Sequence, residues 1–159
     1  MREIFLTFFY VGKAPFAPGS FGSFAGLVVA YLILLYFPLE TLFLLSILTA
    51  ILGVKAIDVY EANGGVHDDK SIVIDEVVGI WIAISLAFGI TEIDPSYSWI
   101  IWICSFIFFR VFDIWKPSII GRIDRNVKGG LGVMGDDVVA SIFAAISSAI
   151  AYGVVLKFL

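Results

Sequence analysis

The chain has 159 residues, a formal net charge of −4, 60% hydrophobic residues and a mean hydropathy of +1.02. This apolar content exceeds the roughly half that is typical of soluble globular domains, so a lipid bilayer is the simplest solvent for the sequence. The acidic net charge gives no indication of nucleic-acid binding, and the single cysteine, Cys104, excludes an intramolecular disulfide. We therefore expect one membrane-embedded domain over residues 1–159.

Five long uncharged runs alternate with shorter polar segments. The runs are residues 14–39, 41–54, 77–91, 95–109 and 138–156. A membrane-crossing helix needs about 20 mostly apolar residues, which the first and last runs satisfy and the middle three reach only with their flanks. The pattern predicts an all-α, polytopic membrane bundle of about five transmembrane helices with two longer cytoplasmic loops.

Charged residues fall on one side of this alternation. If every run crosses the membrane, segments 1–13, 55–76 and 110–137 share one face, which then holds nine of the ten Lys/Arg and eleven of the fourteen Asp/Glu. The opposite face holds only Glu40, Glu92, Asp94 and Lys157. Because positively charged loops favour the cytoplasm, we expect the N-terminus inside and the C-terminus outside. All candidate chemistry would then lie in one layer at the membrane surface.

The N-terminal region has two features of interest. Residues 4–11 are too short and too aromatic for a signal peptide, so we expect an interfacial helix there. The following glycine- and proline-rich entry to the first run contains Ser20 and Ser23. A helix start of this kind can present backbone N–H groups to an anion, which makes both serines candidate phosphate contacts. Close helix packing by small residues explains the same composition equally well.

The first inner loop ends in two adjacent acids. It runs from an Asn-Gly-Gly turn through His67 and Asp68 to Asp75 and Glu76, which open the third run. The helix dipole favours one carboxylate in a first turn. It explains two adjacent acids less well, because they repel each other at the edge of a region of low dielectric constant. A bound divalent cation would relieve that repulsion, and His67 and Asp68 are candidates to support such a site.

The fourth run ends in three charged residues at regular spacing. Arg110, Asp113 and Lys116 follow at i, i+3 and i+6, so neighbours share a helix face, and Pro117 is expected to end the helix. A salt-bridge ladder at the membrane edge would account for this spacing. So would a site in which two cations bind phosphate oxygens beside a metal-binding carboxylate.

The second inner loop, residues 113–137, combines acids with glycines in its later part, residues 121–137. Its glycines are Gly129, Gly130, Gly132 and Gly135, and they would allow the backbone to approach a ligand closely. Asp136 and Asp137 are expected to begin the fifth span, which repeats the pattern of paired acids at a helix start. The two acidic pairs and Asp113 form an oxygen-rich set of the kind that suits Mg²⁺, which commonly works with substrate phosphates. Asp124 lies in the same loop.

Other phosphate chemistries fit the sequence poorly. Cys104 and Arg110 have the spacing of cysteine phosphatases, but no glycine lies between them to shape a phosphate cradle. His67 is the only histidine, so a phosphohistidine route would lack its usual second histidine. The chain has no Gly-x4-Gly-Lys-Ser/Thr loop, which argues against ATP use of that type.

Four stretches together resemble the phosphatidylglycerophosphatase A family. They are residues 17–23, 71–76 with Gly79, 109–117 and 129–137, in the family's order and across nearly the whole chain. Two positions depart from the family pattern, Ile119 and Ser141, and both look like packing positions. The resemblance implies a Mg²⁺-dependent lipid phosphatase of the bacterial inner membrane that converts phosphatidylglycerophosphate to phosphatidylglycerol. The distribution of Lys and Arg would place its active site on the cytoplasmic side.

The residues and the resemblance lead to one set of expected roles. The metal ligands and general base are expected among Asp75, Glu76, Asp113, Asp136 and Asp137, with Asp124 as a further catalytic candidate. Phosphate contacts are expected from Arg110, Lys116, Ser20 and Ser23. Attack by a metal-activated water is the expected reaction, and an aspartyl-phosphate intermediate stays open. The alternative function is a divalent-cation transporter. It explains the acids but not the neighbouring basic cluster, which is a candidate for anion binding and consists of Lys116, Arg122, Arg125 and Lys128. A structural protein whose acids only cap helices is a second alternative.

Overall fold

The computed structural model describes residues 2–158, and those residues contain α-helices and short 3₁₀ turns but no β-strand. The elements are α1 (Arg2–Leu6), η1 (Val11–Lys13), α2 (Pro18–Leu34), α3 (Leu39–Ala62), α4 (Ile74–Gly89), η2 (Pro95–Tyr97), α5 (Ser98–Trp115), α6 (Ile119–Asn126) and α7 (Gly130–Val155). The end residues of the expected domain, 1 and 159, lie outside the described range.

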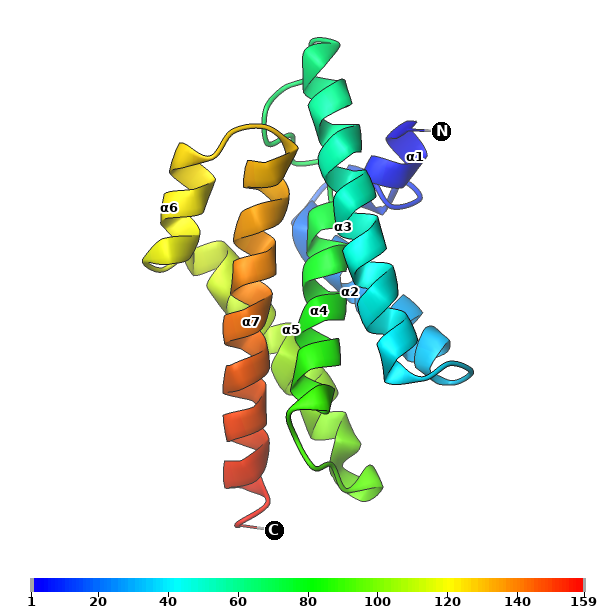
Figure 1. Ribbon diagram of the computed structural model, residues 1–159, viewed down its shortest axis with the longest axis vertical. Helices are drawn as coiled ribbons and strands as arrows, with labels where there is room; N and C mark the ends of the chain where they lie inside the picture. The colour runs from blue at the N-terminus through cyan, green and yellow to red at the C-terminus, as the bar shows by residue number, and fades with distance from the viewer. Residues whose placement is uncertain (1, 159) are drawn as a thin grey trace.

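Helix α4 forms the centre of the bundle. It contacts α7, α3, α2 and α5, which surround it (Figure 1). Its side chains are buried along nearly its whole length, as expected for a helix that is apolar on all faces. The two acids in its first turn are therefore attached to the most enclosed helix of the molecule.

The five apolar runs correspond to α2, α3, α4, α5 and α7. Three helical segments are long and apolar enough to cross a membrane, namely Leu39–Ala62, Pro95–Trp115 and Gly130–Val155. Helix α2 is apolar but shorter, with 17 residues, and the enclosed α4 has 16. The predicted all-α membrane bundle is confirmed, while the number of crossings stays a prediction.

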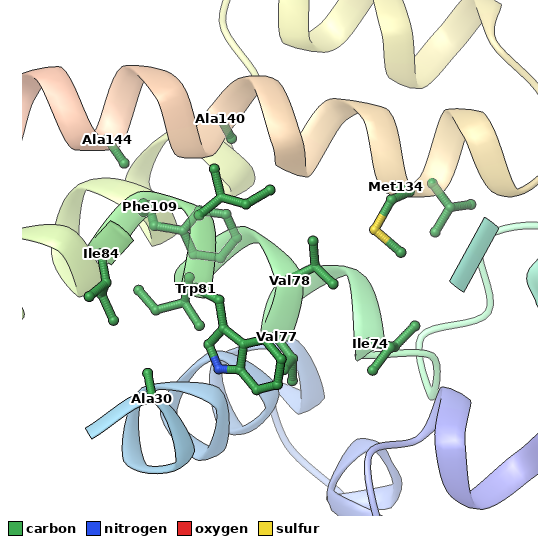
Figure 2. Close-up of a cluster of buried hydrophobic side chains, with 14 of the residues drawn as sticks. Ala30, Ile74, Val77, Val78, Trp81, Ile84, Phe109, Met134, Ala140 and Ala144 are labelled. Atoms are coloured by element: carbon green, nitrogen blue, oxygen red, sulfur yellow. The ribbon is translucent and has the colours of Figure 1, made fainter. Parts of the chain in front are cut away.

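Small residues allow α2 and α5 to pack closely against α4. A Cβ atom on Gly26 of α2 would lie 2.8 Å from the side chain of Ile80, and one on Gly79 would overlap the ring of Phe109. The Trp81 indole, directed from α4 toward α2 (Figure 2), donates its Nε1–H to the carbonyl oxygen of Gly26 at 2.8 Å. The packing interpretation of the α2 glycines thus holds for Gly26, as is common where helices meet in membranes.

The charged segments gather at one end of the bundle. Helices α1 and α6 and the segment 63–73 lie at the upper end in Figure 1, whereas the turns 35–38 and 90–97 lie at the lower end. This arrangement agrees with the one-sided distribution of charge expected from the sequence.

Several expected loops are helical instead. Helix α7 begins at Gly130, so the expectation of a loop through Gly135 is wrong, and Asp136 and Asp137 lie in the second turn of α7 rather than at its start. Helix α3 continues eight residues beyond the predicted end of its run at residue 54. Residues 119–126 form α6. Glycine disfavours helix interiors by about 1 kcal/mol, and contacts with neighbouring helices outweigh that preference here.

The N-terminal interfacial helix is also shorter than predicted. Helix α1 ends at Leu6, and the next residues include three with left-handed backbone conformations, Phe8, Phe9 and Tyr10, before η1 begins. The expectation of a helix over residues 4–11 is therefore correct only for its first part.

Candidate active site

A pocket of about 500 Å³ lies at the charged end of the bundle. Its walls come from the start of α2, the segment 67–72, the start of α4, the end of α5, helix α6 and the first two turns of α7. The charged residues that line it are Asp68, Asp69, Lys70, Asp75, Glu76, Arg110, Asp113, Lys116, Asp124, Arg125, Asp136 and Asp137. Acids thus outnumber bases in this wall.

Asp75 and Glu76 occupy the first turn of α4, facing the start of α2. A Cβ atom on Gly19 of α2 would overlap Glu76 Oε1 and would lie 3.3 Å from Arg110 Nη1. Only a glycine lets the α2 backbone approach these two side chains so closely. Gly19 therefore closes one side of the pocket without displacing the charged groups within it.

Asp136 and Asp137 face the α4 acids from the second turn of α7. Each has only 3% of its surface exposed, and Asp75 has 8%. One carboxylate oxygen from each of Asp75, Glu76 and Asp137 lies within 4.8 Å of the other two. Two helices far apart in the sequence therefore bring three carboxylates into a cluster small enough to share one ion.

Four carboxylate oxygens in this region are buried and have no hydrogen-bond partner among residues 2–158. They are Asp75 Oδ1, Glu76 Oε2, Asp136 Oδ1 and Asp137 Oδ2. An isolated carboxylate in a medium of low dielectric constant is strongly destabilised unless it is protonated, paired or bound to a metal. Oxygen-only donors in this number are the ligand set that a hard divalent cation such as Mg²⁺ prefers, so the residues fit that ion.

Arg110 is held from two sides at the pocket wall. Its Nη1 donates to Asp113 on the same helix and to Ser23 Oγ of α2, the latter at 3.3 Å. Ser23 in turn donates its hydroxyl to the carbonyl oxygen of Gly19 at 2.9 Å. The Nε of Arg110 is buried and has no hydrogen-bond partner in the described part of the chain. The guanidinium is therefore fixed in orientation and retains a donor for a further acceptor.

Lys116 connects three helices. It ends α5 in a left-handed conformation with φ 46°, which is uncommon for a residue other than glycine and is found at functional sites. Its Nζ donates to Asp124 of α6 and, at 2.6 Å, to Asp136 of α7. Burial lowers the pKa of this ammonium group, but the hydrogen bonds to the two carboxylates outweigh burial and raise the pKa above its usual value. Lys116 is therefore positively charged at neutral pH.

The segment 67–72 is tied to the end of α3. His67 Nδ1 lies 2.6 Å from Glu61 Oε1, and the Tyr60 hydroxyl donates to Asp69 Oδ2 at 2.6 Å. Asp69 Oδ1 also accepts the backbone N–H of Ser71 at 2.9 Å. The hydrogen bond from Tyr60, followed by that from Ser71, lowers the pKa of Asp69 below its usual value. These contacts hold one wall of the pocket in place.

The structure gathers nearly all the residues singled out in the sequence. Lining the pocket are Asp75, Glu76, Asp113, Asp124, Asp136, Asp137, Arg110, Lys116, His67 and Asp68. Ser23 contacts Arg110 and does not line the pocket itself, and Ser20 is not among the lining residues. The chemical roles of these side chains stay predictions.

Sequence reasoning missed two charged residues of the wall, Asp69 and Lys70, and considered a third, Arg125, only as a member of the basic cluster. Asp69 and Lys70 adjoin Asp68, so their place in the same loop was the available signal. Of the four glycines expected to approach a ligand, only Gly132 lines the pocket. Gly129 and Gly130 face α3 instead, which corrects the interpretation of that pair.

Comparison with known proteins agrees with this arrangement. The family model for phosphatidylglycerophosphatase A matches residues 4–152. A phosphatidylglycerophosphatase A from Escherichia coli is 37% identical over 134 residues, covering 84% of this chain and 73% of the relative. The one from Haemophilus influenzae is 37% identical over 130 residues, covering 82% of this chain and 76% of the relative.

A third relative, from Bacteroides thetaiotaomicron, is provisionally described as a phosphatidylinositol-3-phosphatase and is 33% identical over 153 residues, covering 94% of this chain and 92% of the relative. No solved structure matches the chain. The match to the family model extends over nearly the whole chain, and the four sequence stretches that carry the resemblance supply most of the pocket's charged residues. The chain therefore belongs to the phosphatidylglycerophosphatase A family and is a phosphatase.

Proposed function

We propose that this protein hydrolyses phosphatidylglycerophosphate to phosphatidylglycerol and phosphate in a Mg²⁺-dependent reaction. The observation that carries the proposal is the group of four buried, unpartnered carboxylate oxygens beside Arg110 and Lys116. The substrate is proposed from the names of the relatives from Escherichia coli and Haemophilus influenzae.

The charge balance of the pocket supports a metal requirement. Six of its carboxylates belong to the candidate catalytic set, and the two cations hydrogen-bonded to members of that set are Arg110 and Lys116. A phosphate monoester brings further negative charge, so its approach to this wall would be repelled without an added cation. When bound, Mg²⁺ would polarise the phosphate oxygens and lower the pKa of a water molecule at the site. Asp75, Glu76 and Asp137 would hold it, with Asp136 and Asp113 adjacent.

Two side chains of the wall are suited to hold the phosphate. The planar guanidinium of Arg110 matches phosphate geometry, and its orientation is already set by Asp113 and Ser23. Lys116 supplies a point charge that is shared between Asp124 and Asp136. A phosphate oxygen arriving at Lys116 would compete with these two carboxylates and free one of them to accept a proton. Asp124, the more exposed of the two, is the better placed to do so.

The position of the pocket supports a lipid substrate. Ile114 lines the pocket and is largely exposed, and Phe16, next to the lining residue Ala17, is exposed as well. Apolar side chains at the rim of a polar pocket allow acyl chains to stay in the bilayer while the headgroup reaches the carboxylates. By the positive-inside rule, we place this end of the bundle at the cytoplasmic side of the bacterial inner membrane.

Phosphate release by the purified protein in detergent tests the proposal. We expect release from phosphatidylglycerophosphate with Mg²⁺, no release with EDTA, and no release in either condition from the Asp75→Asn variant. Folded protein that releases no phosphate from this lipid with Mg²⁺ would refute the substrate assignment. Release that persists in EDTA would refute the metal requirement while leaving the substrate intact.

A further inference from the structure

The start of α7 has no capping side chain of its own. The residue before it, Gly129, has φ 74° and no side chain with which to cap the helix. The first N–H groups of any helix lack partners within that helix. One of them, the N–H of Gly130, donates to Asp58 Oδ1 at 2.7 Å. The cap of α7 thus comes from α3, 72 residues earlier in the chain.

Two glycines make this contact possible. A Cβ atom on Gly130 would overlap the carbonyl oxygen of Val54, and one on Gly129 would lie 2.7 Å from Asp58 Oδ1. Val54 and Asp58 are four residues apart and so lie on the same face of α3. The start of α7 is therefore seated on a single turn of α3, and side chains at either glycine would separate the two helices.

Asp58 lies outside the pocket, and its side-chain hydrogen bond leads to the pocket through α7. It is not among the lining residues. Asp136 and Asp137 follow Gly130 by six and seven residues, which is about 9–10 Å along a helix axis. Because the helix between them is continuous, a shift at its capped end moves both carboxylates relative to those on α4.

We propose that Asp58 is a positioning residue for the phosphatase reaction: by capping α7 from α3, it sets where Asp136 and Asp137 stand opposite Asp75 and Glu76. This inference rests on the proposed function, since those four carboxylates are the proposed metal and catalytic groups. Asp58 itself contacts neither metal nor phosphate. The competing explanation is that the cap only stabilises the folded chain.

A pair of substitutions separates these explanations. Asparagine caps helices about as well as aspartate, whereas alanine does not cap. In Mg²⁺-dependent phosphate release from phosphatidylglycerophosphate, we expect Asp58→Ala to lower kcat by about tenfold or more, as for residues that orient metal-site ligands. We expect KM to change by less than about twofold, because the substrate contacts remain, and Asp58→Asn to keep most of the wild-type kcat.

Two readouts accompany the rates. Hydrogen–deuterium exchange of residues 127–135 should be faster in Asp58→Ala than in the wild type and Asp58→Asn. The rise in unfolding temperature on adding Mg²⁺ should be smaller in Asp58→Ala. Asp94→Ala is the matched control, because it removes a carboxylate cap at the opposite end of the bundle, and its kcat should equal that of the wild type.

The inference is overturned if folded Asp58→Ala has the wild-type kcat, or if Asp58→Asn loses as much activity as Asp58→Ala. Should Asp58→Ala fail to fold, Asp58→Glu takes its place, because it keeps a carboxylate acceptor while its added methylene should displace the start of α7 from α3. A wild-type protein that releases no phosphate refutes the proposed function instead. In that case, the Mg²⁺-induced change in unfolding temperature still decides whether Asp58 positions the carboxylates, while exchange at residues 127–135 reports only that the cap is lost.

Discussion

The two ends of the bundle use aspartate in different ways. In the turn between α4 and α5, Asp94 Oδ1 accepts the N–H of Ser96 at 2.8 Å, and the backbone N–H of Asp94 donates to the hydroxyl of Tyr152 at 2.8 Å. At the other end, Asp75 and Asp137 each have a buried oxygen without a partner. A structural aspartate such as Asp94 accepts a hydrogen bond from a nearby backbone N–H. The aspartates proposed to bind a ligand have buried oxygens that accept no hydrogen bond within the described residues.

The sharpest way to test this comparison is to neutralise one aspartate at each end. We expect Asp137→Asn to lower Mg²⁺-dependent phosphate release by at least about 100-fold, because it removes a charged ligand from the cluster. Asp94→Asn should keep the wild-type rate, since asparagine also accepts the N–H of Ser96. Without Mg²⁺, Asp137→Asn should unfold at the same temperature as the wild type or higher, because one buried charge is gone. Equal loss of activity in both variants would contradict the comparison.

The second-largest expected effect is the loss of kcat/KM when the guanidinium of Arg110 is replaced. Arg110→Lys keeps the charge but loses the planar fork that contacts Asp113 and Ser23. Loss of a hydrogen bond to a charged group costs about 1.5–3 kcal/mol, so we expect kcat/KM to fall by about 10- to 100-fold. Steady-state kinetics across a range of phosphatidylglycerophosphate concentrations measures this fall in kcat/KM. A variant with wild-type kinetics would show that only the charge of Arg110 matters.

A smaller effect is expected where Ser23 supports Arg110. Ser23→Ala removes a neutral hydrogen bond, typically worth about 1 kcal/mol, so kcat/KM should fall by only a few-fold. Ser20→Ala is the matched comparison, because Arg110 donates to Ser23 and not to Ser20, and its effect should be smaller still. A larger loss in Ser20→Ala than in Ser23→Ala would identify Ser20 as the phosphate contact expected from the sequence.

The smallest effect is on stability and depends on pH. The hydrogen bond from Tyr60 lowers the pKa of Asp69, so it contributes stability above the usual aspartate pKa of about 3.9. That contribution is lost as the pH falls through the lowered pKa. Tyr60→Phe should therefore lower the free energy of unfolding by about 1 kcal/mol at pH 7 and by less at pH 3. Denaturant titration of both proteins at pH 7 and pH 3 measures these differences. An equal loss of unfolding free energy at the two pH values would contradict this assignment.

Much of the site could be predicted because the local patterns were simple. Paired acids beside helix starts and an i, i+3 series of charges identify Asp75, Glu76, Arg110 and Asp113 without any knowledge of the fold. The positions of these residues on α4 and α5 agree with the expectation, and Lys116 ends α5 before Pro117.

The parts of the structure that the sequence did not predict depend on contacts between segments that are distant in the chain. Residues 130–135 resemble a loop by propensity, yet they form the first turns of α7, whose start is capped by Asp58 and lies against the Val54 backbone of α3. The role of Gly19 likewise depends on Glu76, which is 57 positions away in sequence. Such pairings leave no local signal in a single sequence, since each partner taken alone has an ordinary composition.

The enclosure of α4 has a consequence for how the protein responds to its membrane. Longer helices, α3, α5 and α7, surround this helix and present large exposed apolar side chains, including Leu44, Ile103 and Ile146. A bilayer that becomes thicker or thinner acts first on these outer helices. The carboxylates at the start of α4 are positioned by α2, α5 and α7 rather than by lipid, so we expect the proposed reaction to depend little on bilayer thickness.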